Sequence, residues 1–305
     1  MGILLGLLSA LCWGGSDFIA RFATRRIGTL RTTFYMQFAG CLLLSILLRR
    51  LGGWGHLFDG SGWPPWAWGA LAGLLNAIGT LALYRSFEIG KMAVVAPISA
   101  SYPALTAILS VSTGEHLTPA RLAGTVLILA GAIVVVRGES GSPTEGDEKE
   151  ARQEEQAGRV SSAPTKLGAG ISWALLAASG YGVLFWLLGT HIVPSAGYAA
   201  TVWMIRLTCS MLTFPGLVLV KQPLCLPHHG SVLAALLAIA ILDTGAFVLN
   251  NRGMQLEQVS VVSVLASLYS VVTVVLATMF LREPISRRQW LGMVGIFSGI
   301  FLISR

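Results

Sequence analysis

Apolar residues in this chain lie in long uninterrupted runs, and polar residues lie mainly in the short breaks between them. A membrane-spanning helix needs about 20 mostly apolar residues, and runs near that length recur along almost the whole sequence. A transmembrane β-barrel would instead show alternating segments of about ten residues. The pattern predicts an all-α integral membrane protein with ten transmembrane helices, at 3–22, 31–48, 66–86, 92–112, 119–137, 168–188, 197–219, 232–250, 259–280 and 288–303.

One long polar stretch, residues 138–166, separates the fifth predicted span from the sixth. It contains seven of the 14 acidic residues, together with Ser, Pro and Gly, and almost no large apolar side chain. Such a segment buries too little apolar surface to offset the entropy lost on folding. We therefore predict a disordered polar linker between two domains, at 1–137 and 167–305.

The two predicted domains repeat one another in sequence. Residues that match at a shift of 167 or 168 positions include Arg85 and Arg252, Tyr102 and Tyr269, Thr106 and Thr273, and Gly131 and Gly299. Each copy holds five predicted spans, and because five is odd the second copy enters the membrane from the opposite side. The prediction is therefore two inverted five-helix repeats, an arrangement that many secondary transporters use.

Composition agrees with a membrane protein and excludes several other classes. The chain is 54% hydrophobic and 11% charged, whereas a soluble domain carries roughly 25% charged residues. The net charge of +7 comes from Lys and Arg at predicted span ends, so it does not indicate nucleic-acid binding. The four Cys and five His show no metal-ligand spacing, and no GxxxxGK[ST] loop occurs. We expect no cofactor, no metal and no enzymatic activity.

Short motifs in both halves carry a resemblance to a known family. They are Trp13-Gly14-Gly15-Ser16, Gly114-Glu115-His116-Leu117-Thr118, Arg206-Leu207 and Arg282-Glu283-Pro284-Ile285. On these residues the chain resembles the EamA family of the drug/metabolite transporter superfamily, over both halves. The resemblance implies transport of small metabolites, with amino-acid and drug exporters among the members. One departure is Gln37-Phe38, where the family often has Arg, and it leaves the first-half cavity without that charge.

An ionisable side chain near the membrane centre costs about 2.5–3.5 kcal/mol on insertion scales, so it marks a candidate functional site. Trp13, Asp17 and Arg21 follow at i, i+4 and i+8, and therefore share one helix face. Two interpretations stay open at this point. Asp17 forms a structural ion pair with Arg21, or it binds a cationic group or a proton while Trp13 stacks on the substrate.

A second polar set lies in later spans. Asn76 and its repeat mate Asp243 are expected at similar depth, where they serve either the cavity or hydrogen bonds between spans. Arg206 requires an anion nearby, either Asp243 on the next span or a substrate carboxylate. If Asp243 pairs with Arg206, Asp17 is the better candidate for proton coupling.

Deep aromatic residues complete the expected cavity, because an aromatic and moderately polar lining suits an amphipathic solute. The predicted substrate-binding residues are Trp13, Asp17, Tyr35, Gln37, Asn76, Tyr102, Tyr181, Trp186, Trp203, Arg206, Asp243, Asn250 and Tyr269. The predicted function is a secondary transporter, an exporter of small amphipathic metabolites such as amino acids or organic cations, working by alternating access. Import or exchange of the same solutes, a channel and a non-transporting scaffold are the alternatives.

The expected partners are a small-molecule substrate and the lipid bilayer, with protons as a candidate coupling ion. The expected location is a bacterial plasma membrane, where the chain crosses many times. The sequence leaves the oligomeric state open, and a monomer can suffice. Counting Lys and Arg places fifteen on the side of the linker and five on the side of the termini. The positive-inside rule then puts the linker in the cytoplasm, whereas the family resemblance implies cytoplasmic termini.

Overall fold

The structure, a computed structural model, describes residues 1–51, 54–55, 62–113, 118–139, 166–223, 230–257, 259–282 and 285–303. Every secondary-structure element within these ranges is helical. The predicted linker lies almost entirely outside the described residues, so its disorder stays a prediction. The family motifs at 114–117 and 283–284 also lie outside them.

Helices of the first half are α1 (Gly2–Ile27), α2 (Thr29–Leu51), α4 (Pro64–Ile89), α5 (Met92–Ser99), α6 (Tyr102–Ser112) and α7 (Pro119–Glu139). Those of the second half are α9 (Lys166–Leu187), α10 (Val193–Ala196), α11 (Tyr198–Leu219), α12 (Gly230–Leu256), α13 (Val259–Ser267), α14 (Tyr269–Leu276) and α15 (Arg287–Ile303), with π-helical turns η1 (Leu188–Ile192) and η2 (Ala277–Leu281). A glycine with positive φ precedes the second long helix of each half. Gly28, with φ of 84°, lies between α1 and α2, and Gly197, with φ of 77°, lies between α10 and α11. This backbone conformation favours glycine.

Eight of the described segments are long and apolar enough to cross a membrane. They are Gly2–Ile27, Thr29–Arg50, Pro64–Ile89, Met92–Ser112, Gly170–Ala196, Tyr198–Leu219, Gly230–Leu256 and Val262–Leu281. A shorter apolar stretch, Leu122–Val135, lies in α7, and α15 has 17 residues. The all-helical membrane class is therefore confirmed, whereas the count of ten spans stays a prediction.

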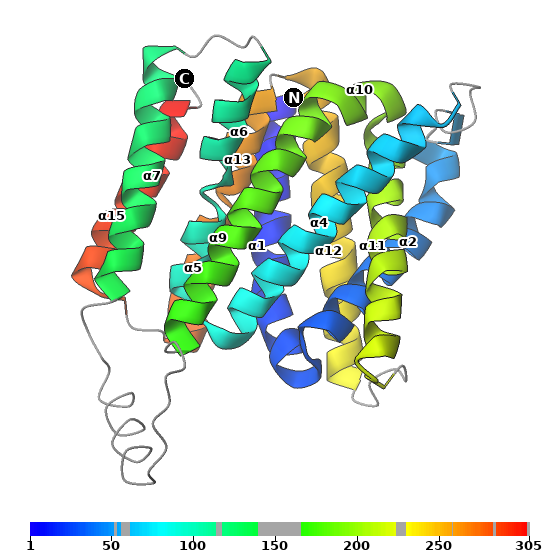
Figure 1. The fold of residues 1–305 in the computed structure, drawn as a ribbon, viewed down its shortest axis with the longest axis horizontal. Helices are drawn as coiled ribbons and strands as arrows, with labels where there is room; N and C mark the ends of the chain where they lie inside the picture. The colour runs from blue at the N-terminus through cyan, green and yellow to red at the C-terminus, as the bar shows by residue number, and fades with distance from the viewer. Residues whose placement is uncertain are drawn as a thin grey trace, which may run out of the picture.

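The helices pack as a bundle in which each half contacts the other along several helix pairs (Figure 1). Helix α1 packs on α12, and its counterpart α9 packs on α4. Helices α7 and α15 pack on one another at one edge of the bundle (Figure 1). The start of α1 and the end of α15 lie at the same end of the molecule (Figure 1).

Glycines allow α7 and α15 to approach backbone to backbone. A Cβ atom at Gly131 would lie 2.6 Å from the Gly292 carbonyl oxygen, and one at Gly299 would lie 2.6 Å from the Gly124 carbonyl oxygen. Gly131 and Gly299 are repeat mates, and so are Gly124 and Gly292. Small residues permit this close packing between helices in a membrane.

Two spans are broken at matching places. In the first half α5 ends at Ser99 and α6 begins at Tyr102, with Pro97 and Pro103 on either side of the break. In the second half α13 ends at Ser267 and α14 begins at Tyr269 without a proline. Proline removes a backbone donor and clashes with the preceding turn, which accounts for the first break. Both breaks place a tyrosine at the start of the second helix segment.

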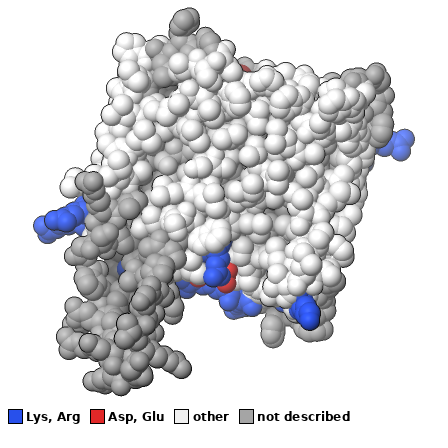
Figure 2. All heavy atoms as spheres, in the orientation of Figure 1, with Lys and Arg blue, Asp and Glu red and all other residues white. Residues whose placement is uncertain are grey.

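The outer surface shows the same division between apolar and charged residues as the sequence. Figure 2 shows a broad face with almost no charge. Lys and Arg lie along its lower edge, the end at which α1 and α4 finish, and at its left and right margins (Figures 1 and 2). The exposed side chains of the long helices are largely Leu, Ile, Val and Phe. An apolar band with basic residues at one end is typical of a multi-pass membrane protein.

Candidate functional site

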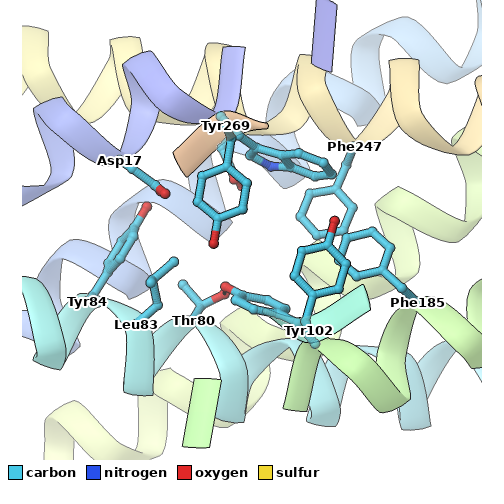
Figure 3. Close-up of a pocket in the computed structure, with 11 residues that line it drawn as sticks. Asp17, Thr80, Leu83, Tyr84, Tyr102, Phe185, Phe247 and Tyr269 are labelled. Carbon is cyan, nitrogen blue, oxygen red and sulfur yellow. Dashed lines mark hydrogen bonds between the residues drawn. The ribbon is translucent and has the colours of Figure 1, made fainter. Parts of the chain in front are cut away.

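A pocket lies where helices of both halves meet (Figure 3). The cavity volume is about 30 Å³. The lining residues are Trp13, Asp17, Thr80, Leu83, Tyr84, Tyr102, Tyr181, Phe185, Asp243, Phe247 and Tyr269. They come from α1, α4, α6, α9, α12 and α14, and the two helix breaks place Tyr102 and Tyr269 among them.

Most of the pocket is built from equivalent positions of the two halves. The repeat mates that line it are Trp13 and Tyr181, Asp17 and Phe185, Thr80 and Phe247, and Tyr102 and Tyr269. Two of these pairs combine a polar first-half residue with a phenylalanine of the second half. The lining positions therefore match between the two halves, whereas the side chains at those positions differ in size and chemistry.

One end of the pocket is polar. The Asp17 carboxylate and the Tyr84 hydroxyl point toward one another in Figure 3, with Thr80 and Leu83 nearby. The Asp17 side chain is 4% exposed. Within the described chain, no hydrogen bond or ion pair to another residue reaches its carboxylate. A buried carboxylate without a partner is costly, so this position requires a ligand, a water or a proton.

The opposite end is a group of stacked rings. Phe185 stacks on Tyr102 with ring centroids 4.8 Å apart and on Phe247 at 6.2 Å, and the interplanar angles are 22° and 7°. Trp13 meets Phe185 and Phe247 edge-on, at 5.8 and 5.0 Å. Offset-stacked and edge-on pairs are the favoured arrangements of aromatic rings. These contacts fix an apolar, aromatic wall before any ligand arrives.

Behind that wall lies a buried ion pair. The Arg206 guanidinium is 2.6 Å from an Asp243 carboxylate oxygen, and it donates a hydrogen bond of 2.7 Å to the Gln37 side-chain oxygen. It also lies 5.1 Å from the centre of the Phe247 ring. Arg206 is 0% exposed and does not line the pocket. Of the two partners predicted for Arg206, the structure therefore shows Asp243.

The predicted pairing of Asp17 with Arg21 is not what the structure shows. The Arg21 guanidinium donates to the Gly90 carbonyl oxygen at 3.2 Å, near the end of α4. Four residues of helix rise by about 6 Å along the axis, so a shared face does not ensure contact between two side chains. Asp17 faces the pocket, and Arg21 lies one turn farther toward the membrane edge.

The tyrosine hydroxyls hold the two halves together across the pocket. Tyr102 donates to the Ser263 carbonyl oxygen at 3.0 Å, and the Tyr269 hydroxyl is 3.0 Å from the Ser99 hydroxyl. Ser99 donates in turn to the Ala96 carbonyl oxygen at 2.9 Å. Ala96 is the repeat mate of Ser263, so the two connections are equivalent except for the inserted Ser99 side chain.

The structure brings six of the predicted residues to the pocket: Trp13, Asp17, Tyr102, Tyr181, Asp243 and Tyr269. Arg206 and Gln37 form the layer behind it. Asn76 is buried beside Cys209, to whose sulfur it donates at 3.3 Å, and Asn250 is buried near Met254. Neither amide lines the pocket.

Three predicted aromatic residues lie elsewhere. Trp203 donates to the Ser45 hydroxyl at 2.8 Å and packs against the rings of Trp54 and Trp66. The Trp186 indole nitrogen is 3.5 Å from the Thr113 hydroxyl at the end of α6. Tyr35 packs against the adjacent ring of Phe34. Helix spacing alone does not distinguish these positions from pocket positions.

Five lining residues were absent from the predicted site: Thr80, Leu83, Tyr84, Phe185 and Phe247. A signal for four of them exists in the sequence. Thr80 and Tyr84 continue the face of Asn76 at i+4 and i+8, and Phe185 and Phe247 are the repeat mates of Asp17 and Thr80. Leu83 has no such signal, because an apolar residue within an apolar span has no distinguishing pattern.

A multi-pass helical bundle with a part-polar pocket between its halves defines the class of membrane transporters of small molecules. The comparison with protein families agrees: the model of the EamA-like transporter family matches residues 1–137 and 168–305. The chain therefore belongs to the EamA-like transporter family. It is a multi-pass integral membrane protein that resides in a lipid bilayer and acts on a small-molecule substrate.

Two further comparisons concern individual proteins. The chain is 29% identical over 134 residues to "Uncharacterized protein MJ1333.1" of Methanocaldococcus jannaschii, a match that covers 44% of this chain and 94% of that protein. A solved structure described as "Crystal structure of protein" matches with a TM-score of 0.66 at 19% identity, over 99% of this chain and 95% of the other. That likeness shows the fold alone.

Proposed function

We propose that the protein is a secondary transporter that exports small amphipathic solutes, such as organic cations or amino acids, by alternating access. The observation that carries the proposal is the pocket between the halves, polar at Asp17 and aromatic at Phe185 and Phe247. The sequence contains no nucleotide-binding loop, which favours an ion gradient or exchange as the energy source. A proton at Asp17 is one candidate coupling ion.

We propose further that the chain forms ten spans as two inverted five-helix repeats. The packing supports this arrangement, because α1 on α12 is the counterpart of α9 on α4. The four pairs of repeat mates in the pocket lining support it as well. In inverted repeats the substrate site lies near the membrane midplane, and one unit rocks against the other. The M. jannaschii relative, matched over 44% of this chain, corresponds in length to one half.

The test of transport uses the purified full-length chain in proteoliposomes. A thermal-shift screen of amino acids, amines and nucleosides selects a ligand, because a molecule that binds the folded state raises its stability. Counterflow of that ligand is then measured for wild type and for Phe185→Trp, which adds volume inside the pocket. The matched control is Leu176→Trp on the outward face of α9, where Leu176 is 44% exposed.

We expect Phe185→Trp to abolish counterflow and Leu176→Trp to retain it. A stabilising ligand that shows no counterflow in wild type contradicts the transporter function. Equal flux in both variants contradicts the pocket as the route. Uptake without stimulation by solute on the opposite side identifies a channel.

The orientation has its own test, a reporter fused to the carboxyl terminus. Several basic residues lie along the end of the bundle opposite the termini (Figures 1 and 2), and the positive-inside rule then favours that end in the cytoplasm. A reporter that is active only outside the cytoplasm should then be active at the carboxyl terminus. An inactive reporter, with an active cytoplasmic reporter at the same position, reverses this orientation. We place the protein in a bacterial plasma membrane.

A further inference from the structure

We propose that the transported solute is a small organic monocation with an aromatic tail, that Asp17 is its counter-ion, and that the pocket rejects solutes with a carboxylate. This inference rests on the transporter function proposed above and names its substrate class. Three observations carry it: the charge balance of the pocket, the isolation of Arg206, and the separation of polar and aromatic ends.

The charge balance favours a cation. The pocket is lined by two acidic residues, Asp17 and Asp243, and by no Lys or Arg among the described residues. Arg206 neutralises Asp243 through the 2.6 Å ion pair. Asp17 therefore supplies one negative charge that no described residue balances. At this buried position a substrate ammonium supplies the missing partner, since a charged hydrogen bond replaces an uncompensated buried charge.

The isolation of Arg206 removes the group that a carboxylate would need. Its guanidinium is held by Asp243 and Gln37, and the Phe247 ring lies against it. The side chain is 0% exposed. A substrate carboxylate could reach Arg206 only by displacing Asp243, which would leave that acid buried and unpaired at a cost of several kcal/mol. A carboxylate elsewhere in the pocket would face the unbalanced charge of Asp17.

The two ends of the pocket determine how the cation lies. Asp17 and Tyr84 provide oxygen acceptors at one end, and an ammonium carries three donors. Tyr102, Phe185 and Phe247 form the stacked wall at the other end. In a conformation with a wider pocket than that of Figure 3, a flat apolar tail lies against this wall while the charged head meets Asp17. Because repeat mates differ at the two ends of the pocket, the solute binds in one orientation.

The test uses probes that share one tail and differ in charge. They are 2-phenylethylamine, a cation; phenylalanine, a zwitterion; 3-phenylpropionate, an anion; and 2-phenylethanol, which is neutral. Binding to the full chain in nanodiscs is measured by calorimetry, and flux is measured separately in proteoliposomes. The variants are Asp17→Asn, Asp17→Glu as the charge-retaining control, and Ser179→Ala, an exposed serine on α9, as the control for handling and folding.

We expect the amine to bind at least tenfold more tightly than each of the three other probes. Asp17→Asn should weaken amine binding by about tenfold or more, the value of one hydrogen bond to a charged group. Asp17→Glu should restore most of the loss, and 2-phenylethanol should bind both variants alike. If Asp17→Asn fails to fold, Asp17→Glu and the ranking of the four probes on wild type still decide the matter.

Phenylalanine or 3-phenylpropionate binding as tightly as the amine overturns the proposal, and so does amine binding that Asp17→Asn leaves unchanged. These outcomes leave the transporter function standing if any probe shows counterflow. Amine binding with the expected ranking but without flux of any probe supports the charge selectivity and contradicts transport. Absence of binding by all four probes overturns the proposal.

Discussion

Two regions in which the halves of this transporter meet differ in how far the repeat has been kept. At the contact of α7 and α15, glycines occur at matching positions, and a Cβ at Gly131, Gly292 or Gly299 would meet a backbone carbonyl of the other helix. In the pocket, matching positions hold Asp17 and Phe185, or Thr80 and Phe247. Close contact between two backbones leaves room only for glycine, whereas a cavity can be lined by many kinds of side chain. The repeat is therefore retained in the contact between helices, whereas the pocket lining has diverged.

The buried charges illustrate the same difference. Asn76 and Asp243 are repeat mates. The neutral amide of Asn76 donates to the Cys209 sulfur, and its oxygen is buried without a hydrogen-bond partner among the described residues. Asp243 carries a charge, and Arg206 of α11 supplies its partner. The first half has Gln37 in α2, which accepts a hydrogen bond from that same arginine. The two halves therefore share one ion pair. The second half supplies both of its charges, and the first half supplies a neutral hydrogen-bond acceptor.

The largest expected effect comes from breaking this ion pair. Arg206→Gln leaves the Asp243 carboxylate buried without its cation, a change that costs about 3–5 kcal/mol. Unfolding of the purified protein in detergent, followed by temperature or denaturant, measures the loss. The double variant Arg206→Met with Asp243→Leu removes both charges and should recover most of the stability. A single variant as stable as wild type would show that the pair does not hold α11 to α12.

An intermediate effect is expected at the contact that kept the repeat. Gly131→Ala and Gly299→Ala each place a methyl group 2.6 Å from a carbonyl oxygen, and overpacking of this kind costs about 1–3 kcal/mol. The two losses in unfolding free energy should be similar, because the two contacts are equivalent. Gly245→Ala on α12 is the control, since a Cβ there meets no atom within 4 Å. Unequal losses would mean that the two contacts have diverged like the pocket.

The smallest effect distinguishes a side-chain contact from a main-chain contact. Ser99→Ala removes the partner of the Tyr269 hydroxyl, and a hydrogen bond of this kind contributes about 1 kcal/mol. Ser263→Ala leaves the acceptor of Tyr102 in place, because that acceptor is the main-chain carbonyl. Among the described residues the buried Ser263 hydroxyl has no hydrogen-bond partner, so its loss should be neutral. Equal thermal shifts in the two variants would remove the distinction.

The framework was accessible from the sequence because hydropathy and repetition act over many residues at once. The predicted span 197–219 became α11 at Tyr198–Leu219, and 92–112 became α5 and α6 together. The break within that span follows from Pro97 and Pro103, but the matching break before Tyr269 has no proline to announce it. Long apolar segments leave little choice of structure.

The site was less accessible, because helix spacing fixes a face but not its neighbour. Trp203 and Arg206 lie three residues apart, yet Trp203 packs between Trp54 and Trp66 while Arg206 lies behind the pocket. Asp17 and Arg21 share a face without pairing. Phe185 is the repeat mate of Asp17, but a phenylalanine in an apolar span gives no indication of its own that it lines a pocket.

The single Asp17 has a consequence for parity. A chain with the length of one half would need two copies to surround a pocket, and each copy would bring the same side chain to both matched positions. Such a site holds two carboxylates or none at the matched positions. One substitution in the sequence then changes the charge of the site by two units. Two unlike halves in one chain permit an odd number. Asp17 opposite Phe185 is such a case, and a site with one unbalanced charge matches a solute with one.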